Sequence, residues 1–520
     1  MILATGSILL DFRLPSATTW FFLALLLAIT LFFRFKRVLS LRNVDLLMLF
    51  LMAPPLLYLR ESRDARQVAL AGLHQDQIQF AAGIAAAGQA DPLALAATGL
   101  AAAEDQVRLR TASSAGAYLR ADRAVWRAYL WLLICSAYWL IRCLLDLALV
   151  RRPAFQPNLN ASGLGFFGLA LLTLLSLKTI LPSETVPSGH SQSVLLERAA
   201  IVAAQAAEKI SSPGSPLAPA GRGDGETGPA FDAAFWFRGG IATICHIIVV
   251  TGLIWIGARH FQDLGSGMAA AVLYLLLPYT AYQGWDLHHA LPAALLVSAV
   301  ALYRYPMVVG LLLGVASSLV FFPLVLLPVW FGFYRGRGAA RFVAAVALVL
   351  VTTLSYLWFD DELRPQLWSA LGWTGSSAAG NGASLPVANW RAWDPSAKPE
   401  AEGLWTGFEL HYAYRLPLFI AYLALVIATA VRPAPKNLAH LIALSGALVL
   451  GIQFWYADSG GIYVLWYLPF LVLLFVRPNL AEKYPPRIEA ATDSLSRAFR
   501  WLKHRLFKEK SVPQPAKVSI

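Results

Sequence analysis

Long hydrophobic segments alternate with short polar loops along most of the chain. A helix of about 17–25 apolar residues is long enough to cross the hydrocarbon core of a bilayer. The stretch 306–333 has basic residues at both ends, so we expect a hairpin of two short helices with breaks near Pro323 and Pro328. The predicted spans are 17–34, 43–59, 126–149, 162–181, 239–257, 265–282, 287–303, 306–333, 341–358, 416–431, 438–456 and 462–476.

Lysine and arginine are concentrated in the short loops between these spans, which marks such loops as cytoplasmic. Alternate segments return the chain to the same side at each basic loop. We therefore predict an integral protein of a bacterial inner membrane, with the N-terminus outside and the C-terminus in the cytoplasm. The basic loops are 34–42, 150–153, 303–306, 334–341 and 431–436.

Composition supports this interpretation, because 58% of the 520 residues are hydrophobic and only 14% are charged. A water-soluble protein needs more charge to cover its surface. The net charge of +12 lies mainly in the basic loops and tail, so we do not expect a nucleic-acid partner. The fold class predicted is an all-α polytopic membrane protein with about 11–13 transmembrane helices.

The spans and loops divide the chain into six regions. Long non-basic loops are placed outside, and residues 60–125 within the first region are predicted to be amphipathic helices lying on the membrane face. The regions are 1–181 with N-terminal spans, 182–236 with an outer helix and a flexible linker, 237–358 with the central spans and hairpin, 359–415 as a Trp-rich outer loop, 416–478 with the last spans, and 479–520 as a basic cytoplasmic tail.

The most polar short stretch between two spans is GWDLHHALPA, residues 284–293. It places Asp286, His288 and His289 at the outer start of the span 287–303. A carboxylate beside a bilayer suits a general base, and histidine can donate, accept or bind a metal near neutral pH. The alternative is that Asp286 only caps the helix amides at the water interface.

Further polar residues are placed at the same outer face. Asp361 and Arg364 follow the span 341–358, and His411 and Arg415 precede the span 416–431. Arginine holds phosphate through a planar two-pronged contact, so this set suits a phosphate-bearing lipid substrate. The alternative for 360–364 is a charge cluster that marks the end of a helix.

Other ionisable residues lie inside predicted spans. Arg142 and Asp146 are four residues apart on one helix face, which favours a structural pair. Asp45 and His246 have no partner that the sequence identifies. The sequence contains no Walker A glycine loop, no HExxH metalloprotease motif and no GxSxG motif of serine hydrolases. No cofactor is therefore predicted, and whether a divalent metal is needed is left open.

The region GMAAAVLYLLLPYTAYQGWDLHHALPAALLVSAVALYRYPMVVGLLLGVASSLVFFPLVLLPVWFGFYRGRGAARF (267–342) resembles the polytopic GT-C glycosyltransferases. It is most similar to bacterial mannosyltransferase-like members that use polyprenyl-phosphate sugars. The ending GIYVLWYLPFLVLLFVRP (461–478) resembles their last span. The two stretches cover about a fifth of the chain, and their motifs are apolar and of low specificity.

This resemblance implies an enzyme that moves a sugar from a polyprenyl phosphate to an acceptor outside the cytoplasm, with the lipid bilayer as its second partner. It implies a carboxylate base, for which Asp286 stands in the matching loop. The family usually carries its key acid in the first outer loop, where this sequence has no convincing motif, and a lysine often found in the hairpin is missing. The acids available near that first loop are Asp11, Asp64, Asp76, Glu104 and Asp105.

The composition also fits a non-catalytic transporter, a lipid-handling protein or a structural protein of the cell envelope. A transporter needs polar or broken helices near the bilayer midplane. Most charges here lie at helix ends, which favours the enzyme. The sequence names neither the sugar, the acceptor nor the oligomeric state.

Overall fold

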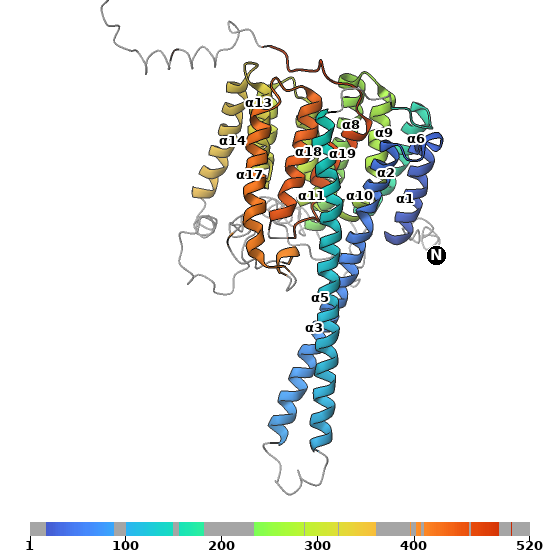
Figure 1. The fold of residues 1–520 in the computed structure, drawn as a ribbon, viewed down its shortest axis with the longest axis vertical. Helices are drawn as coiled ribbons and strands as arrows, with labels where there is room; N and C mark the ends of the chain where they lie inside the picture. The colour runs from blue at the N-terminus through green and yellow to red at the C-terminus, as the bar shows by residue number, and fades with distance from the viewer. Residues whose placement is uncertain are drawn as a thin grey trace, which may run out of the picture.

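The protein is a helical bundle from which one long helical hairpin projects (Figure 1). The computed structural model describes residues 17–87, 100–148, 155–180, 233–284, 286–320, 322–359, 396, 402–406, 410–456, 459–487 and 501. No strand occurs in these ranges. The all-helical class predicted from the hydrophobic pattern is thus confirmed for the described part of the chain.

A helix lies within every predicted span. The helices are α1 (Ala17–Phe32), α2 (Leu41–Leu51), α3 (Ala53–Ala87), α5 (Leu100–Leu145), α6 (Ala161–Ile180), α8 (Ala233–Trp255), α9 (Leu264–Leu276), α10 (Pro278–Gln283), α11 (Leu287–Ala301), α12 (Pro306–Leu319), α13 (Leu327–Tyr334), α14 (Ala339–Phe359), α17 (Arg415–Val431), α18 (Leu438–Trp455) and α19 (Val464–Val476). A π-helical turn, η4 (Ile256–Phe261), extends α8, and short 3-10 turns are η2 (Phe35–Arg37), η3 (Asp146–Ala148), η5 (Phe322–Leu326), η8 (Leu404–Thr406) and η9 (Tyr412–Tyr414).

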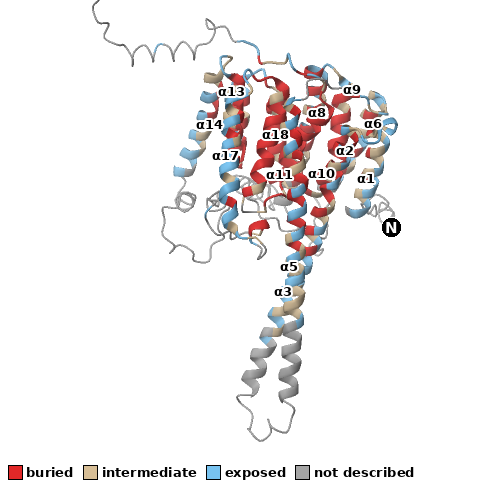
Figure 2. Ribbon diagram, in the orientation of Figure 1, coloured by how far each residue is buried: buried red, intermediate tan, exposed pale blue. Residues whose placement is uncertain are grey.

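Among the described residues, six helical segments are long and apolar enough to cross a membrane, and seven shorter apolar helices accompany them. The helices on the rim of the bundle, α14 and α17, expose large apolar side chains along their outward faces (Figure 2). Such a surface is unfavourable in water and favourable against lipid. The architecture is that of a polytopic membrane protein. Examples are Leu348, Val351, Ile420 and Ile427, all more than half exposed.

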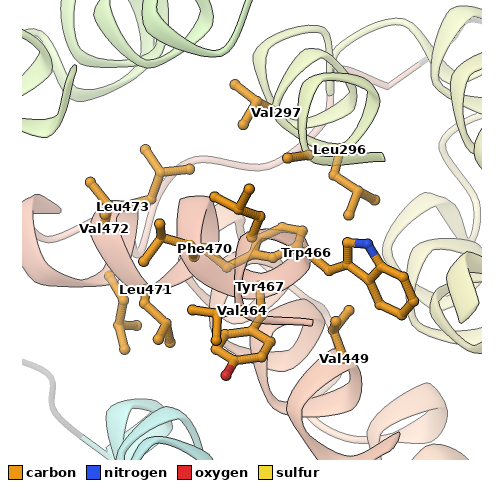
Figure 3. Close-up of a cluster of buried hydrophobic side chains, with 14 of the residues drawn as sticks. Leu296, Val297, Val449, Val464, Trp466, Tyr467, Phe470, Leu471, Val472 and Leu473 are labelled. Carbon is orange, nitrogen blue, oxygen red and sulfur yellow. The ribbon is translucent and has the colours of Figure 1, made fainter. Parts of the chain in front are cut away.

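The centre of the bundle is α19, every residue of which is buried. It packs among α9, α11 and α18. Figure 3 shows its side chains from Val464 to Leu473 meeting Leu296 and Val297 of α11 and Val449 of α18. A helix that is apolar all round is covered either by other helices or by lipid, and here neighbouring helices cover it. Its packing therefore positions the ends of α9, α11 and α18 relative to one another.

The stretch 306–333 folds back on itself, as predicted. α12 ends at Leu319, and η5 and α13 return beside it. The chain breaks just before Pro323, whose ring cannot continue the hydrogen-bond ladder of α12. Gly310 lets α12 approach α14 closely, because a Cβ there would lie 2.5 Å from the Phe342 carbonyl oxygen.

The two ends of the bundle differ in charge. At one end, called the basic end below, side chains join loops that are distant in sequence, for example His260 to the Ala301 carbonyl and Tyr334 to the Tyr303 carbonyl. Arg477 binds Asp146 at the same end. The opposite end, called the hairpin end, is where α3 and α5 leave the bundle (Figure 1). Loops of the basic end are 34–42, 302–305, 335–338, 432–437 and 477–487.

The sequence predicts amphipathic helices lying on the membrane face for residues 60–125. In the described part of this range, 60–87 and 100–125, α3 and α5 pair with each other and extend away from the bundle (Figure 1). Asp76 accepts a hydrogen bond from Ser114 at 2.7 Å, and Arg66 lies 3.3 Å from Asp122, as an antiparallel register requires. With 46 residues, α5 is about 69 Å long, more than twice the hydrocarbon thickness. α5 packs against α3 in this hairpin.

Candidate functional site

Asp286 begins α11 at the hairpin end. Its Oδ1 accepts a hydrogen bond of 2.9 Å from the His288 backbone N–H, and its own N–H donates to the Gln283 carbonyl at 3.1 Å. The capping role considered from the sequence is therefore confirmed. The side chain is 28% exposed, so a carboxylate oxygen also reaches the surface. Capping of α11 is compatible with a role as general base, because the cap uses only Oδ1 of the carboxylate.

His288 and His289 follow Asp286 into the bundle and are both only 6% exposed. Nε2 of His289 lies 3.7 Å from Oδ2 of Asp286, longer than a hydrogen bond. Within the described part of the chain, neither ring nitrogen of His288 has a hydrogen-bond partner, and Nδ1 of His289 has none either. Each such atom has lost its hydration at a cost of about 1–3 kcal/mol. Other buried polar atoms in the described ranges, such as Nδ1 of His260, also lack partners, so these three atoms are distinguished by their grouping beside Asp286.

Aromatic rings cover the two histidines. Trp466 stacks between Phe322 and Tyr463, with ring centroids 4.1 Å and 4.0 Å apart. The edge of Trp466 faces His288, and its Nε1 donates to the His288 carbonyl at 3.0 Å. Tyr463 lies 5.6 Å from the His289 ring. The aromatic layer comes from η5 and the start of α19, so the central helix of the bundle positions it.

An ionic cluster lies where the hairpin leaves the bundle. Glu402 is bound by Arg63 at 2.7 Å and by Arg66, and it accepts a hydrogen bond from the Tyr129 hydroxyl at 3.2 Å. Arg66 also contacts Asp122. All five side chains are partly or fully buried, and the four charges cancel. This set, called the Glu402 cluster below, ties the end of the Trp-rich loop to α3 and α5.

The segment before α19 connects the Glu402 cluster to the histidines. The Ser459 N–H donates to the Glu402 carbonyl at 2.8 Å, and Gln283 donates through Nε2 to the Ile462 carbonyl at 2.9 Å. Tyr463 follows directly. Residues from three distant parts of the sequence thus meet at the hairpin end.

Arg60 is a residue that the sequence analysis missed. It lies one helical turn before Arg63 on α3, and it forms no ion pair with any carboxylate in the described ranges. Its Cζ lies 5.9 Å from the ring centroid of Tyr282, four residues before Asp286. A half-buried guanidinium without a carboxylate partner is suited to hold an anion. The available signal was the repeat of arginine at every third position, Arg60, Arg63 and Arg66.

The structure separates the other predicted binding residues. Arg415 is completely buried, and its Nε donates to the Trp455 carbonyl at 3.0 Å. This bond gives Arg415 a structural role between α17 and α18, and the substrate role predicted for it stays a prediction. His411 is exposed at the hairpin end and caps η9 by accepting from Ala413 N–H. Asp361 and Arg364 lie outside the described residues.

The acids considered for the first outer loop do not join the site. Asp64 is exposed on α3, and Asp76 binds Ser114 within the hairpin. Glu104 and Asp105 lie on α5 close to its start. Asp11 is outside the described residues.

Three of the ionisable residues within predicted spans, Asp45, Arg142 and Asp146, form a buried network at the basic end. The Asp45 carboxylate accepts from Arg142 at 3.0 Å and from the Tyr138 hydroxyl at 2.7 Å, and Arg142 reaches Asp146 at 3.1 Å. Arg477 completes the network by binding Asp146 at 2.9 Å. The structural role predicted for the Arg142–Asp146 pair agrees with this arrangement.

The described residues were searched for a metal site, and the whole sequence was compared with known proteins. No group of three or more His, Cys, Asp or Glu side chains within the described ranges is arranged to hold a metal ion. No protein-family model matches the sequence, and no curated protein or solved structure shows significant similarity to it.

Proposed function

We propose that the chain is a membrane glycosyltransferase with a GT-C-like bundle, which moves a sugar from a polyprenyl phosphate to an acceptor at the hairpin end. The hairpin end would face away from the cytoplasm, with the basic end inside, as the distribution of basic loops favours. The apolar outer surface gives a lipid-linked donor access to the side of the bundle.

The observation that carries the proposal is the grouping of Asp286 with two buried histidines, three of whose four ring nitrogens have no hydrogen-bond partner among the described residues. Polar atoms left unsatisfied under an aromatic layer are expected where a hydroxylated ligand supplies the missing hydrogen bonds. In this state Tyr463 and Trp466 cover the histidines, so a ligand must displace part of that layer to reach them.

The proposed reaction uses Asp286 as general base. Its carboxylate accepts the proton of the acceptor hydroxyl while that oxygen attacks the anomeric carbon of the donor sugar. The bond from this carbon to the phosphate oxygen breaks, and the electron pair leaves with the polyprenyl phosphate. Arg60 binds the phosphate as its negative charge grows, and His288 and His289 donate to and accept from sugar hydroxyls.

A sugar-transfer assay in proteoliposomes with polyprenyl-phosphate sugars tests this proposal. Asp286→Asn preserves the helix cap, because asparagine caps as well as aspartate, and removes the base. Asp263→Asn is a matched control, since Asp263 caps α9 at the basic end by accepting from Ser266. We expect turnover to fall by about 100-fold or more in the first variant only. Equal turnover in both variants would exclude Asp286 as the base.

The hairpin favours a second candidate, a non-catalytic envelope protein whose outer segments contact partners. A helix pair that extends far beyond the membrane is not needed for lipid-linked sugar transfer. Replacing residues 73–116 by a short turn keeps the Glu402 cluster and removes most of the projection. Retained sugar transfer in this variant supports the enzyme, and loss of an assembly phenotype without any transferase activity in the wild type supports the alternative.

A further inference from the structure

We propose that His246 is a positioning residue that holds the loop carrying Asp286, an assignment that rests on the function proposed above. His246 lies on α8 and is 1% exposed. Its Nε2 is 2.8 Å from the Gly284 carbonyl oxygen, and its Nδ1 is 2.9 Å from the Tyr274 hydroxyl. It therefore joins α8 to α9 and to the residue two positions before Asp286.

The chemistry of the partners fixes the tautomer of this ring. A backbone carbonyl only accepts, so Nε2 of His246 must carry the hydrogen and donate to Gly284. Nδ1 is then an acceptor, and the Tyr274 hydroxyl donates to it. Both ring nitrogens are satisfied while the ring stays neutral, as burial favours. In this respect His246 is the opposite of His288, whose nitrogens lack partners.

The fit around Gly284 leaves the loop little freedom. A Cβ at this position would lie 2.2 Å from the Thr280 carbonyl oxygen and 2.8 Å from Nε2 of His246. On the other side, Gln283 is held by its bond to the Ile462 carbonyl. Gly284 and Gln283, two and three positions before Asp286, are thus held from α8 and from the segment before α19.

This constraint sets the position of the carboxylate. Asp286 lies 3.7 Å from His289 through Oδ2 and caps α11 through Oδ1. If the Gly284 carbonyl were released, Asp286 would still cap the helix, but its backbone would sample more positions. A misplacement of about 1 Å at a reacting group lowers a rate by as much as 100-fold. Packing alone would be served by an apolar ring, so the polar ring indicates positioning.

Two conservative variants separate the two hydrogen bonds. In His246→Gln the side-chain amide nitrogen takes a place near Nε2, and the bond to Gly284 can persist. In His246→Asn the shorter side-chain amide lies near the place of Nδ1, and the hydrogen bond to the Gly284 carbonyl is lost. His260→Asn is the matched control, because His260 is a second buried histidine that binds a backbone carbonyl, that of Ala301 at 2.6 Å, at the basic end.

The experiment compares amide hydrogen exchange over residues 283–289 and steady-state kinetics in the full-length protein reconstituted in liposomes. We expect exchange about 3- to 10-fold faster in His246→Asn, as the loss of one buried hydrogen bond implies, with His246→Gln and His260→Asn close to the wild type. We also expect kcat to fall about tenfold or more in His246→Asn, with the KM for the polyprenyl-phosphate sugar unchanged and kcat rescued in His246→Gln.

Exchange at 283–289 that is unchanged in His246→Asn, or equally fast in His260→Asn, would overturn the positioning role whatever the kinetics. Equal kcat in the Asn and Gln variants would overturn it as well. If the wild type transfers no sugar from any polyprenyl-phosphate donor, the proposed function fails. The exchange comparison then still decides whether His246 holds the loop.

Discussion

Glu402 offers the sharpest test of how the hairpin end is held together. Replacing it by glutamine keeps the size of the side chain and removes the charge that Arg63 and Arg66 share. Arg66 retains Asp122, whereas Arg63 retains only the Tyr129 hydroxyl at 2.6 Å. The three charged side chains are 21–32% exposed, so solvent weakens the ion pairs without abolishing them. We expect a loss of about 1–3 kcal/mol in the docking of 402–406.

This loss corresponds to a docking equilibrium about 5- to 150-fold weaker. Three hydrogen bonds between 402–406 and other described residues remain in the variant. The Glu402 carbonyl accepts from Ser459 N–H and from the Ser459 hydroxyl, and Trp405 Nε1 donates to the Phe454 carbonyl at 3.1 Å. We therefore expect faster local opening rather than release of the whole segment.

Amide hydrogen exchange of 402–406, measured at low and at high salt, detects this opening. In the wild type, exchange should accelerate as salt screens the ion pairs, and in Glu402→Gln it should be fast at both concentrations. Glu482→Gln is the control, because Glu482 is exposed at the basic end and forms no ion pair with a described residue. The reasoning would be refuted if 402–406 exchanged at the wild-type rate in Glu402→Gln. It would also be refuted if Glu482→Gln accelerated this exchange as much as Glu402→Gln does.

Three further predictions concern the bundle. Arg142→Met leaves Asp45 and Asp146 buried with fewer partners, so thermal unfolding in detergent should show that the free energy of unfolding falls by about 3–5 kcal/mol. A fall of less than about 1 kcal/mol would contradict the importance of this network for stability. Gly310→Val forces α12 from α14 and should cost about 1–3 kcal/mol, whereas Gly240→Ala, where a Cβ meets nothing within 4 Å, should be neutral or slightly stabilising. Burial and the charge of Arg335 lower the pKa of Lys436, so the folded state binds this proton less tightly than the unfolded state. Stability should then rise as pH increases toward the normal lysine value of 10.5, and Lys436→Met should remove that rise; a pH profile that is the same in both proteins would refute it.

The hydrophobic pattern was sufficient to predict the helices and the fold-back at 306–333, and six of the helical segments in the described ranges are long and apolar enough to cross a membrane. It was insufficient for the hairpin. An alanine-rich amphipathic helix can be covered by lipid or by another helix, and only the pairing of Asp76 with Ser114 and of Arg66 with Asp122 distinguishes the two.

The candidate site was predicted in part. Asp286, His288 and His289 stood out because polar residues between two spans are conspicuous. Arg415 was assigned to substrate because its sequence position gives its height in the membrane and says nothing of its burial. Arg60 was missed because the sequence does not show which of the neighbouring arginines has a carboxylate partner. The partner of Arg63 is Glu402, which lies more than 300 residues away along the chain.

The chemistry proposed for Asp286 is tested most directly by sugar transfer in sealed vesicles of known orientation, with donor and acceptor supplied only from the medium. With the hairpin end facing the medium, we expect transfer by the wild type and by Asp263→Asn, and none by Asp286→Asn. With the basic end facing the medium, we expect no transfer by any of the three proteins. Equal transfer in the two orientations, or undiminished transfer by Asp286→Asn, would contradict a site at the hairpin end.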